Sequence, residues 1–443
     1  MKRKFNNFFD SKQVLEIARQ TDFVQRKSNK IDPYKFITSF ILLLSNGAYS
    51  LREWALKYST ESDVYISFQA IHKRLSTRCL AFLEKMLEQV LSTSILSTTN
   101  FDVTQLNRFN RVIIEDSTCV KLCDALFEHF SGNSNGKIKK TVTRIQFSFD
   151  LKSLQWINGS LGTYKQTDNS FSTDILGRVE KGDLVLRDLG YWKLSVFKEF
   201  IKQGVYFLSK MKATTLLHNE DESSIDLMKL LKSYEKKGIT KVDIPVLIGG
   251  IKVPVRLVGY KLDSIQAQKK LKAIKQNRHK KRNISKLALY LINWNLFVTN
   301  IEKERCDLEH LTSIYKLRWY IELLFKNWKS NFNFSKIVSA SKGMDPIKPK
   351  IMMYLCLIFM ATCFQPCYNT FNNMMRLKSR KILSPFKFAN RFKQKIVDYL
   401  CRVVLKHDEE FINQELLILE KYCSYENRKD RISMGQLIFN SSP

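Results

Sequence analysis

Two short apolar segments of this 443-residue chain each end directly at an aspartate, and no other feature constrains the fold as tightly. The segments are Arg111–Glu115 (RVIIE), followed by Asp116, and Asp183–Arg187 (DLVLR), followed by Asp188. Runs of this length and composition are typical of buried strands. An aspartate at the carboxyl end of such a strand projects into a crevice, and two of them on neighbouring strands converge. The sequence therefore predicts an α/β fold with two carboxylates at one edge of a sheet.

Two alternatives stay open for these residues. A single aspartate after a strand is often a turn or capping residue. Glu115 also rivals Asp116, because adjacent residues of a strand point to opposite faces and only one of them can face the site. Hard cations such as Mg²⁺ prefer a few carboxylate oxygens together with open positions for water and phosphate. The pair Asp116 and Asp188 has the chemistry of such a metal site.

A third group of residues follows the spacing Tyr315-x-x-Arg318-x-x-x-Glu322-x-x-x-x-x-x-Lys329. At 100° per residue, the four side chains fall within about 60° of one another on a helix, which we expect over 307–332. Glutamate suits a metal ion, and the phenol, guanidinium and ammonium suit adjacent phosphates. The alternative is an ordinary surface helix with an Arg–Glu pair four residues apart.

The charge of the chain indicates a polyanionic partner. Lysine and arginine number 73 against 42 acidic residues, a formal net charge of +31. Such an excess favours nucleic acid first and an anionic membrane surface second, and it disfavours an acidic small molecule. The basic run Lys269–Arg282 (KKLKAIKQNRHKKR) is a candidate track for a DNA backbone, with a solvated helix as the alternative. The six histidines form no metal-binding motif, and no phosphate-binding glycine loop indicates ATP.

The cysteines and the apolar segments favour a cytoplasmic protein. The nine cysteines include no Cys-x-x-Cys pair, which disfavours a zinc site and fits free thiols. The first residues lead into no apolar signal segment. The apolar run Ile351–Phe364 is too short to span a bilayer, so we expect a buried core helix.

Residues 1–105 are predicted to form a helical DNA-binding region. Phe36, Ile37, Phe40, Ile41 and Leu44 recur at helical spacing, and Asn46-Gly47 is expected to end that helix. Ser50-Leu51-Arg52-Glu53 resembles a capping box. A helix over Ser67–Leu75 follows, and the two helices suggest a helix-turn-helix. A plain helical bundle with a basic face fits equally well.

The remainder is predicted as a core interrupted by an insertion. Residues 106–205 and 301–365 form the two parts of a ribonuclease-H-like core, and 206–300 form a β-rich insertion. Residues 366–443 form a helical C-terminal region that is a possible dimerisation segment. Within these regions we expect strands at Thr141–Asp150, Ser153–Gly162 and Leu287–Thr299, a helix at Phe171–Lys181, and a hairpin of Val242–Ile248 and Ile251–Tyr260 around Gly249-Gly250. Many α/β folds share this order of elements.

These residues together resemble the DDE transposases of bacterial insertion sequences, in the group named for its tyrosine–arginine–glutamate–lysine signature, the insertion-sequence-four group. The likeness rests on the signature spacing and on the contexts Asp116-Ser-Thr and Asp188-Leu-Gly-Tyr, and extends over about 30–370. It implies that Asp116, Asp188 and Glu322 hold two Mg²⁺ ions, for which Mn²⁺ can substitute. It also implies that Tyr315, Arg318 and Lys329 contact phosphates of the transposon end.

The resemblance further implies a cut-and-paste reaction on double-stranded DNA, at inverted-repeat ends and at a target. After a first nick, the freed 3′-hydroxyl attacks the opposite strand and forms a hairpin, which is reopened before strand transfer. The group works as a homodimer on DNA, which places this chain at the bacterial nucleoid. Trp294 matches by context a tryptophan that stacks on a flipped base, and a buried strand tryptophan is the alternative.

Two other functions remain compatible with the residues alone. One is a ribonuclease-H-like nuclease that cuts without joining. The other is a basic DNA-binding protein whose acidic residues are structural. Inverted repeats flanking the gene favour the transposase, and metal-dependent cleavage of a linear duplex excludes the non-catalytic protein.

Overall fold

The computed structural model describes residues 10–26, 30–45, 50–94, 106–132, 140–153, 155–276, 285–318, 321–322, 325–326, 329, 331–332, 345–404 and 406–425. The chain divides into two compact units. The first comprises Met1–Phe101, Ser117–Gln166 and Tyr320–Pro443, and the second comprises Asp102–Asp116 and Thr167–Trp319. Strand β1 (Val112–Lys121) passes from the second unit into the first at Asp116.

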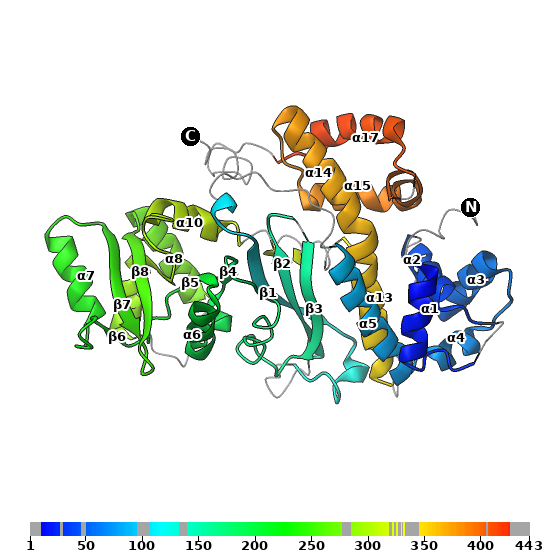
Figure 1. Ribbon diagram of the computed structural model, residues 1–443, viewed down its shortest axis with the longest axis horizontal. Coiled ribbons are helices and arrows are strands. Elements are labelled where there is room, and N and C mark those ends of the chain that lie inside the picture. Colours follow the sequence, from blue (N-terminus) through cyan, green and yellow to red (C-terminus); the bar gives the residue numbers. More distant parts are fainter. Residues whose placement is uncertain are drawn as a thin grey trace. The chain divides into compact units, whose positions relative to one another are not determined.

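A mixed sheet forms the centre of the second unit, with the strand order β1-β4-β5-β9-β8-β7-β6 (Figure 1). Strands β1, β4 and β5 are parallel, and the pairs from β5 to β6 are antiparallel. The bounds are β4 Leu184–Arg187, β5 Tyr206–Lys210, β6 Leu217–His218, β7 Lys241–Ile248, β8 Val253–Lys261 and β9 Trp294–Thr299. The predicted insertion boundary at 206 therefore falls before β5, which pairs with β4.

The predicted hairpin is confirmed as β7 and β8, which pair from Ile248 and Val253 outwards. Gly249 in its turn has φ +71°, a conformation that favours glycine. A Cβ atom at Gly249 would also lie 2.1 Å from Cδ1 of Leu194, so the turn approaches α6 (Leu194–Gln203) too closely for a side chain.

Two predictions in this unit are wrong. Phe171–Lys181 is a series of turns held by hydrogen bonds between residues three apart, such as Arg178 N to Ile175 O at 2.8 Å. Distant partners also hold this segment, because Ser172 Oγ donates to the carbonyl of Tyr191 at 2.9 Å and accepts from Arg187 Nη1. The predicted strand over Leu287–Thr299 begins only at Trp294. Before it lie α9 (Lys286–Tyr290), which Ser285 caps, and a 3₁₀ turn at Leu291–Asn293.

Three further helices complete the second unit. Helices α7 (Leu227–Lys236) and α10 (Leu308–Lys316) begin at Asp226 and Asp307, whose side chains accept hydrogen bonds from the first turn. Helix α8 (Ser264–Gln276) contains the first part of the predicted basic run, and residues 277–282 of that run lie outside the described residues.

The first unit joins the antiparallel pair β2 (Val142–Asp150) and β3 (Gln155–Thr163) to helices. Its N-terminal helices are α1 Ser11–Gln20, α2 Pro33–Ser45, α3 Leu51–Ser62, α4 Phe68–Arg74 and α5 Thr77–Ser94. The predicted helix over 36–44 and the capping box are confirmed, because the Ser50 side chain accepts from Glu53 N and Glu53 accepts from Ser50 N. Asn46-Gly47 lie outside the described residues. Helix α5 packs on β3 and on α13 (Ile347–Phe359) (Figure 1).

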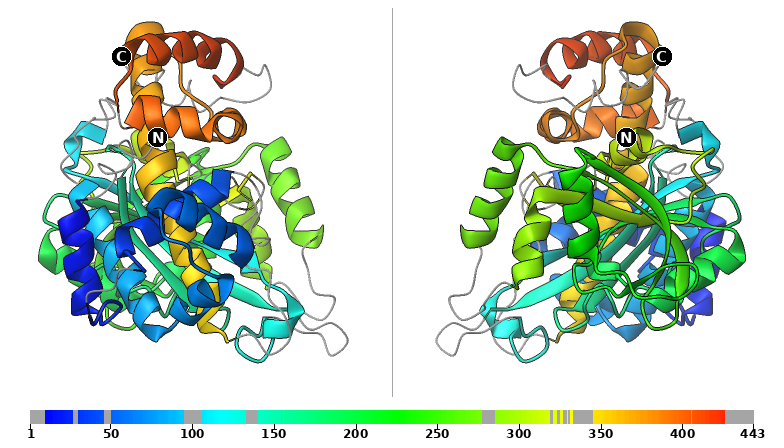
Figure 2. Two further views of the ribbon diagram at one scale, coloured as in Figure 1. Left: turned by 90° about the vertical axis from the view of Figure 1, so that its right-hand side faces the viewer. Right: turned by 90° about the vertical axis from the view of Figure 1, so that its left-hand side faces the viewer.

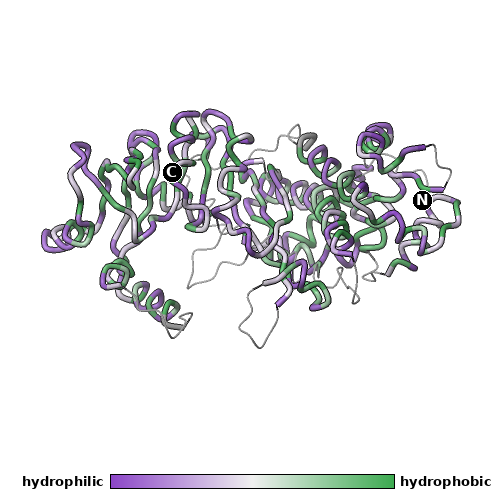
Figure 3. Tube along the Cα trace, turned by 90° about the horizontal axis from the view of Figure 1, so that it is seen from below, coloured by the Kyte–Doolittle hydropathy of each residue, from purple (hydrophilic) through white to green (hydrophobic). Residues whose placement is uncertain are grey.

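The apolar run at Ile351–Phe364 is a buried core helix, as predicted. It belongs to a longer continuous helix, Ile347–Ser379, which includes a π-helical turn at Met360–Phe364 and α14 (Gln365–Ser379). The prediction that this apolar segment is too short to span a bilayer is therefore wrong, since the whole helix is long and apolar enough to do so by length and composition. However, 78% of its most apolar window is buried inside the protein. Figure 3 shows how hydrophobic and hydrophilic residues alternate along most of the other helices.

The C-terminal helices of this unit surround one buried carboxylate. They are α14, α15 (Pro385–Gln394), α16 (Ile396–Asp398), a π-helical turn at Tyr399–Val404 and α17 (Glu409–Tyr422), which cluster together in both views of Figure 2. Glu415 is 2% exposed and accepts hydrogen bonds from Arg391, Lys395 and Tyr399 at 2.7–3.0 Å. Burial opposes its ionisation, but these hydrogen bonds outweigh burial and lower the pKa of its carboxyl.

We expect Glu415→Gln to lower the free energy of unfolding at neutral pH by about 1.5–3 kcal/mol, the contribution of hydrogen bonds to a charged group. A lowered pKa stabilises the fold above the ordinary glutamate pKa of about 4.3 and is lost as pH falls through the folded-state value. Wild type and variant should therefore converge in acid, which urea titrations at several pH values measure. The exposed Glu409→Gln is the matched control, and an equal deficit of Glu415→Gln at all pH values would contradict the assignment.

Candidate active site

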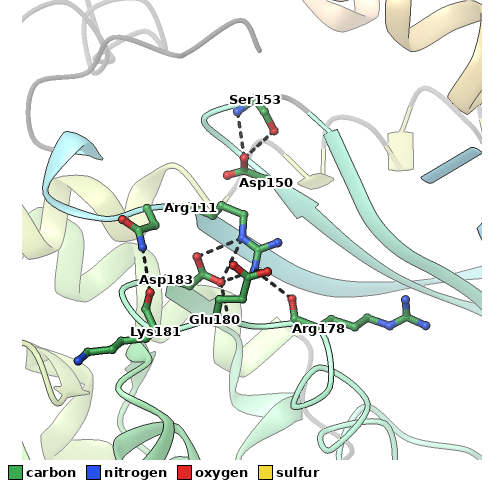
Figure 4. A network of polar contacts seen from close by, with 8 residues as sticks. Arg111, Asp150, Ser153, Arg178, Glu180, Lys181 and Asp183 are labelled. Carbon is green, nitrogen blue, oxygen red and sulfur yellow. Dashed lines mark hydrogen bonds and ion pairs between the residues drawn. The ribbon is translucent and has the colours of Figure 1, made fainter. Parts of the chain in front are cut away.

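Two ion pairs fix the alignment of β1 and β4 within the second unit. Arg111 directly precedes β1, and the buried Asp183 directly precedes β4. Arg111 Nε donates to both carboxylate oxygens of Asp183 at 3.1 Å (Figure 4). At the other end of the pairing, Arg187 Nε donates to Glu115 Oε2 at 2.6 Å. Glu115 and Arg187 are also the last partners in the parallel register. Asp116 and Asp188 are the next residues in the same alignment.

Burial decides between Glu115 and Asp116. Glu115 is 5% exposed, and its partner Arg187 is fully buried. Burial raises the pKa of the Glu115 carboxyl, and the Arg187 guanidinium offsets part of that rise. Asp116 points to the other face, where its side chain is 16% exposed. The strand alternation therefore places Glu115 in the core and leaves Asp116 as the candidate site residue.

The prediction that each aspartate follows the end of a strand is confirmed for Asp188 and wrong for Asp116. Asp188 directly follows β4, as expected, and begins a 3₁₀ turn at Leu189–Tyr191. Its side chain makes no capping hydrogen bond to that turn, so the ordinary capping role does not account for it. Asp116 does not end its strand, because β1 continues to Lys121. The reason is that β1 stays extended beside β2 after its pairing with β4 ends.

Tyr315 and Arg318 lie with these aspartates in the second unit. Tyr315 is 7% exposed, and its hydroxyl donates to the backbone carbonyl of Arg187 at 3.1 Å. Burial raises the pKa of the Tyr315 hydroxyl; the positive charge of Arg318 opposes this rise, and the negative charges of Asp188 and Asp116 add to it. Arg318 Nη1 donates to Asp116 Oδ2 at 2.9 Å. The structure thus brings together four of the predicted site residues.

The single helix predicted for the signature is not continuous. Helix α10 ends at Lys316, and the amides of Leu317 and Arg318 bond to carbonyls three residues back, which tightens the last turn. Glu322 and Lys329 belong to the first unit, where both lie in helical backbone. Glu322 is half-buried and Lys329 is exposed. The four signature residues therefore do not form one stripe on an unbroken helix.

Trp294 is a core residue of the second unit. Its side chain is 1% exposed, and its indole Nε1 donates to Glu235 Oε1 at 3.1 Å. The backbone carbonyl of Trp294 accepts from Lys270 Nζ at 3.0 Å. In this structure the ring has no face open to a base, which favours the alternative of a buried strand tryptophan. Lys270 of the basic run is half-buried, and burial first and then the charge of Lys210 lower the pKa of its ammonium group.

Three residues near the aspartates escaped the sequence analysis. Arg187 is the buried partner of Glu115, and it also donates to Ser172 Oγ at 2.9 Å. Lys210 ends β5, and its ammonium lies 6.0 Å from the centre of the Tyr315 ring. The carboxylate of Asp168 lies against the turn after Asp188, where a Cβ atom at Gly190 would meet Asp168 Oδ2 at 2.6 Å. Gly190 was the available signal, since a glycine two residues after a strand-end aspartate indicates close approach.

Comparisons with known proteins identify the family of this chain. Residues 107–343, more than half of the chain, match the family described as the transposase DDE domain. The chain belongs to this family of DDE transposases. It is 27% identical to the transposase for insertion sequence element IS231F of Bacillus thuringiensis subsp. israelensis, over 84% of this chain and 80% of that protein. It is 25% identical to the transposase for insertion sequence element IS1151 of Clostridium perfringens, over 81% and 77% of the two chains.

The predicted resemblance is thereby confirmed at the level of the family. As a DDE transposase of the insertion-sequence type, the chain is an enzyme of DNA transposition, and enzymes of this family depend on divalent metal ions. A large mixed sheet with helices is consistent with that membership.

The donor set at the aspartates fits a divalent cation. Asp116 and Asp188 offer hard carboxylate oxygens from neighbouring strands, and Asp188 has no capping bond to give up. Within the described residues, no three His, Cys, Asp or Glu side chains are grouped closely enough to hold a metal ion. Two carboxylates alone do not complete the coordination of such a cation, so a metal site here would need further oxygen ligands from water, substrate or another residue.

We expect Arg187→Met to destabilise the protein by about 3–5 kcal/mol, because it leaves the Glu115 carboxylate buried without its partner. The double variant Glu115→Leu/Arg187→Met removes both charges and should recover most of that loss. Urea titrations of the wild type, the single variant and the double variant measure the difference. If the double variant were as unstable as the single one, the unpaired Glu115 carboxylate would not be the cause of the lost stability.

We expect Trp294→Ala to slow the nicking of a transposon end and any later hairpin formation by the same factor. The reason is that removing a buried tryptophan destabilises the fold by about 3–5 kcal/mol. A labelled end duplex resolved on a denaturing gel separates the two steps, and a thermal melt reports stability. Selective loss of the hairpin step in a variant with an unchanged melting temperature would instead show that Trp294 leaves the core to receive a base.

Proposed function

We propose that this transposase cuts DNA at the ends of its element and joins those ends to a target, by phosphoryl transfer that depends on Mg²⁺ held by Asp116, Asp188 and Glu322. The observation that carries the proposal is that Asp116 and Asp188 directly follow Glu115 and Arg187, the last paired residues of two parallel strands in a DDE transposase. Glu322 is included on its place in the signature spacing, four residues after Arg318. Mn²⁺ is expected to substitute for Mg²⁺.

The proposed core is ribonuclease-H-like. Antiparallel β2 and β3 precede β4 in the chain, and β1, β4 and β5 are parallel, with α6 between β4 and β5. This succession of strands and its parallel centre support the assignment. Strands β6 to β9 extend the same sheet and account for the proposed β-rich insertion, which on this reading begins after Lys210.

Divalent cations at such a site activate a water molecule or a 3′-hydroxyl and stabilise the leaving oxygen. The residues of the chain have separate tasks. Tyr315 bonds to the carbonyl of Arg187 and thereby holds the backbone directly before Asp188. Arg318 orients Asp116 through an N–H of its guanidinium, a planar group whose geometry suits phosphate oxygens. We propose that Arg318 and Lys329 bind phosphates of the transposon end, with Tyr315 supporting them.

The remaining assignments follow from the family. We propose that the substrates are inverted-repeat ends and a target duplex, that a hairpin intermediate links first-strand nicking to second-strand cleavage, and that the protein acts as a homodimer on DNA in the bacterial cytoplasm. Helices α3 and α4 of the N-terminal region, joined by a short turn, are proposed to bind DNA. The C-terminal helices are the proposed dimerisation segment.

We expect Asp116→Ala, Asp188→Ala and Glu322→Ala each to abolish Mg²⁺-dependent nicking, a loss of several orders of magnitude, while binding to the same duplex is retained. Carboxylate ligands to the metal have no substitute in these variants. The exposed Asp221→Ala is the matched control and should nick at the wild-type rate. A labelled end duplex and a target plasmid report nicking and joining.

Retained nicking in any one of the three variants would remove that residue from the proposed triad. Loss of nicking in Glu115→Ala together with normal nicking in Asp116→Ala would reverse the choice between these neighbours. Wild-type cleavage that yields no joined product with any target would leave a nuclease that cuts without joining.

A further inference from the structure

A hollow of about 860 Å³ lies at the opposite edge of the second unit's sheet from the two aspartates. Its lining includes Asn110 before β1, Lys181 and Gly182 before β4, and Tyr206 at the start of β5. Asp188 lies after the far end of β4. At about 3.3 Å per residue of extended chain, the five residues from Asp183 to Asp188 alone span roughly 16 Å. A ligand in this hollow is therefore not the phosphate that the aspartates cut.

The charged groups Arg256 and Asp243 of the hollow neutralise each other and already have hydrogen-bond partners. Arg256 forms two hydrogen bonds with Asp243, at 2.7 and 2.8 Å, and its Nη1 donates to the carbonyls of Ile301 and Cys306 at 2.9 Å. Its guanidinium is thus matched by a carboxylate and by backbone acceptors. The Arg305 guanidinium lies 4.8 Å from the centre of the Tyr206 ring and covers that face. The hollow therefore offers no open aromatic face there on which a nucleobase can stack.

The rim of the hollow is positively charged. Arg108 and Arg305 each donate a hydrogen bond to the other's backbone carbonyl, which ties the 3₁₀ turn at Leu106–Arg108 to the loop after β9. Lys181 and Lys303 are exposed beside them. Among the described residues, no carboxylate forms an ion pair with Arg108, Lys181 or Lys303. Glu302, which also lines the hollow, lies 3.9 Å from Arg305 Nε. Three uncompensated cations thus surround a neutral floor.

We propose that this hollow, lined by Arg108, Lys181, Lys303 and Arg305, binds the phosphate backbone of duplex DNA. Positive charge without a stacking surface favours phosphates over bases, so contacts here hold DNA without reading its sequence. The inference rests on the proposed function, which supplies DNA as the polyanion. It adds a contact remote from the scissile phosphate, on a part of the sheet that the catalytic residues do not use.

The test is the salt dependence of DNA binding by the full-length protein, measured without metal by fluorescence anisotropy on a short linear duplex. Each phosphate neutralised contributes about −0.9 to the slope of log affinity against log salt. Lys181→Gln/Lys303→Gln should make that slope shallower by about two. Between about 0.05 and 0.2 M salt, the variant should then lose roughly tenfold less affinity than the wild type.

Two matched variants guard this measurement. Lys236→Gln/Lys237→Gln removes the same charge from exposed residues at the end of α7 and should leave the slope close to that of the wild type. Lys181→Arg/Lys303→Arg keeps the charge and should also retain the slope. Thermal melts establish that every variant is folded. An unchanged slope in Lys181→Gln/Lys303→Gln, or an equal change in the Lys236/Lys237 control, would overturn the proposal.

A free anion is the competing occupant. If millimolar inorganic phosphate raised the melting temperature of the wild type but not of Lys181→Gln/Lys303→Gln, while the DNA slope stayed the same, the hollow would be a phosphate site and the DNA assignment would be wrong. Because binding is measured without metal, the outcome is separate from catalysis. Wild-type protein that binds DNA with the expected slope but never nicks it would overturn the proposed function and leave this inference standing.

Discussion

The alignment of β1 with β4 is the constraint on which the rest of the candidate site depends. An ion pair lies at each end of this pairing. Arg111 pairs with Asp183 where the strands begin, and Glu115 pairs with Arg187 where the pairing ends, so that the positive residue is on the β1 side in the first pair and on the β4 side in the second. A slip of one residue would separate both pairs and turn every side chain of the strand to the other face. Three of the four charged residues, Glu115, Asp183 and Arg187, are buried, and a buried charge without its partner costs several kcal/mol. The register that brings Asp116 beside Asp188 is therefore specified by residues that do not themselves face the site.

The signature tyrosine and arginine bond to the residues at the ends of this strand pairing. Tyr315 bonds to the main chain of Arg187, and Arg318 bonds to the side chain of Asp116. Helix α10 is thus attached to both strands directly beside the two aspartates. Because Arg318 neutralises Asp116, only part of the local negative charge must be offset by a cation. Tyr315 and Arg318 thus hold the main chain before Asp188 and the side chain of Asp116.

Positive charge is distributed unevenly over the second unit. Some positively charged side chains have structural partners. Arg187 and Arg256 form ion pairs with carboxylates, and Arg256 also donates to a backbone carbonyl. Others remain on the surface at the opposite sheet edge, and Lys270 is withdrawn from the basic run by its bond to Trp294. The net charge of +31 therefore predicts a polyanionic partner but not where that partner lies. Only the burial of individual side chains separates structural cations from those available to DNA.

The sequence by itself determined the elements whose signals are local. Strand composition predicted β4 and β2, glycine spacing predicted the β7–β8 hairpin, and the capping box at Ser50 fixed the start of α3. It also determined the family, because the contexts of Asp116 and Asp188 and the signature spacing are read directly from the chain. These features depend on a few neighbouring residues, so no knowledge of distant contacts is needed.

The tertiary structure alone decided what depends on distant partners. Glu115 and Asp116 are equivalent in sequence, and only the buried Arg187 assigns Glu115 to the core. β1 extends to Lys121 because β2 lies beside it after its pairing with β4 ends. Helix α10 ends at Lys316, and no glycine or proline at that point predicts the end. Trp294 is an aromatic strand residue in either reading, and its 1% exposure is what places it in the core. Burial is a property of the packed chain, whereas periodicity and spacing are properties of the sequence.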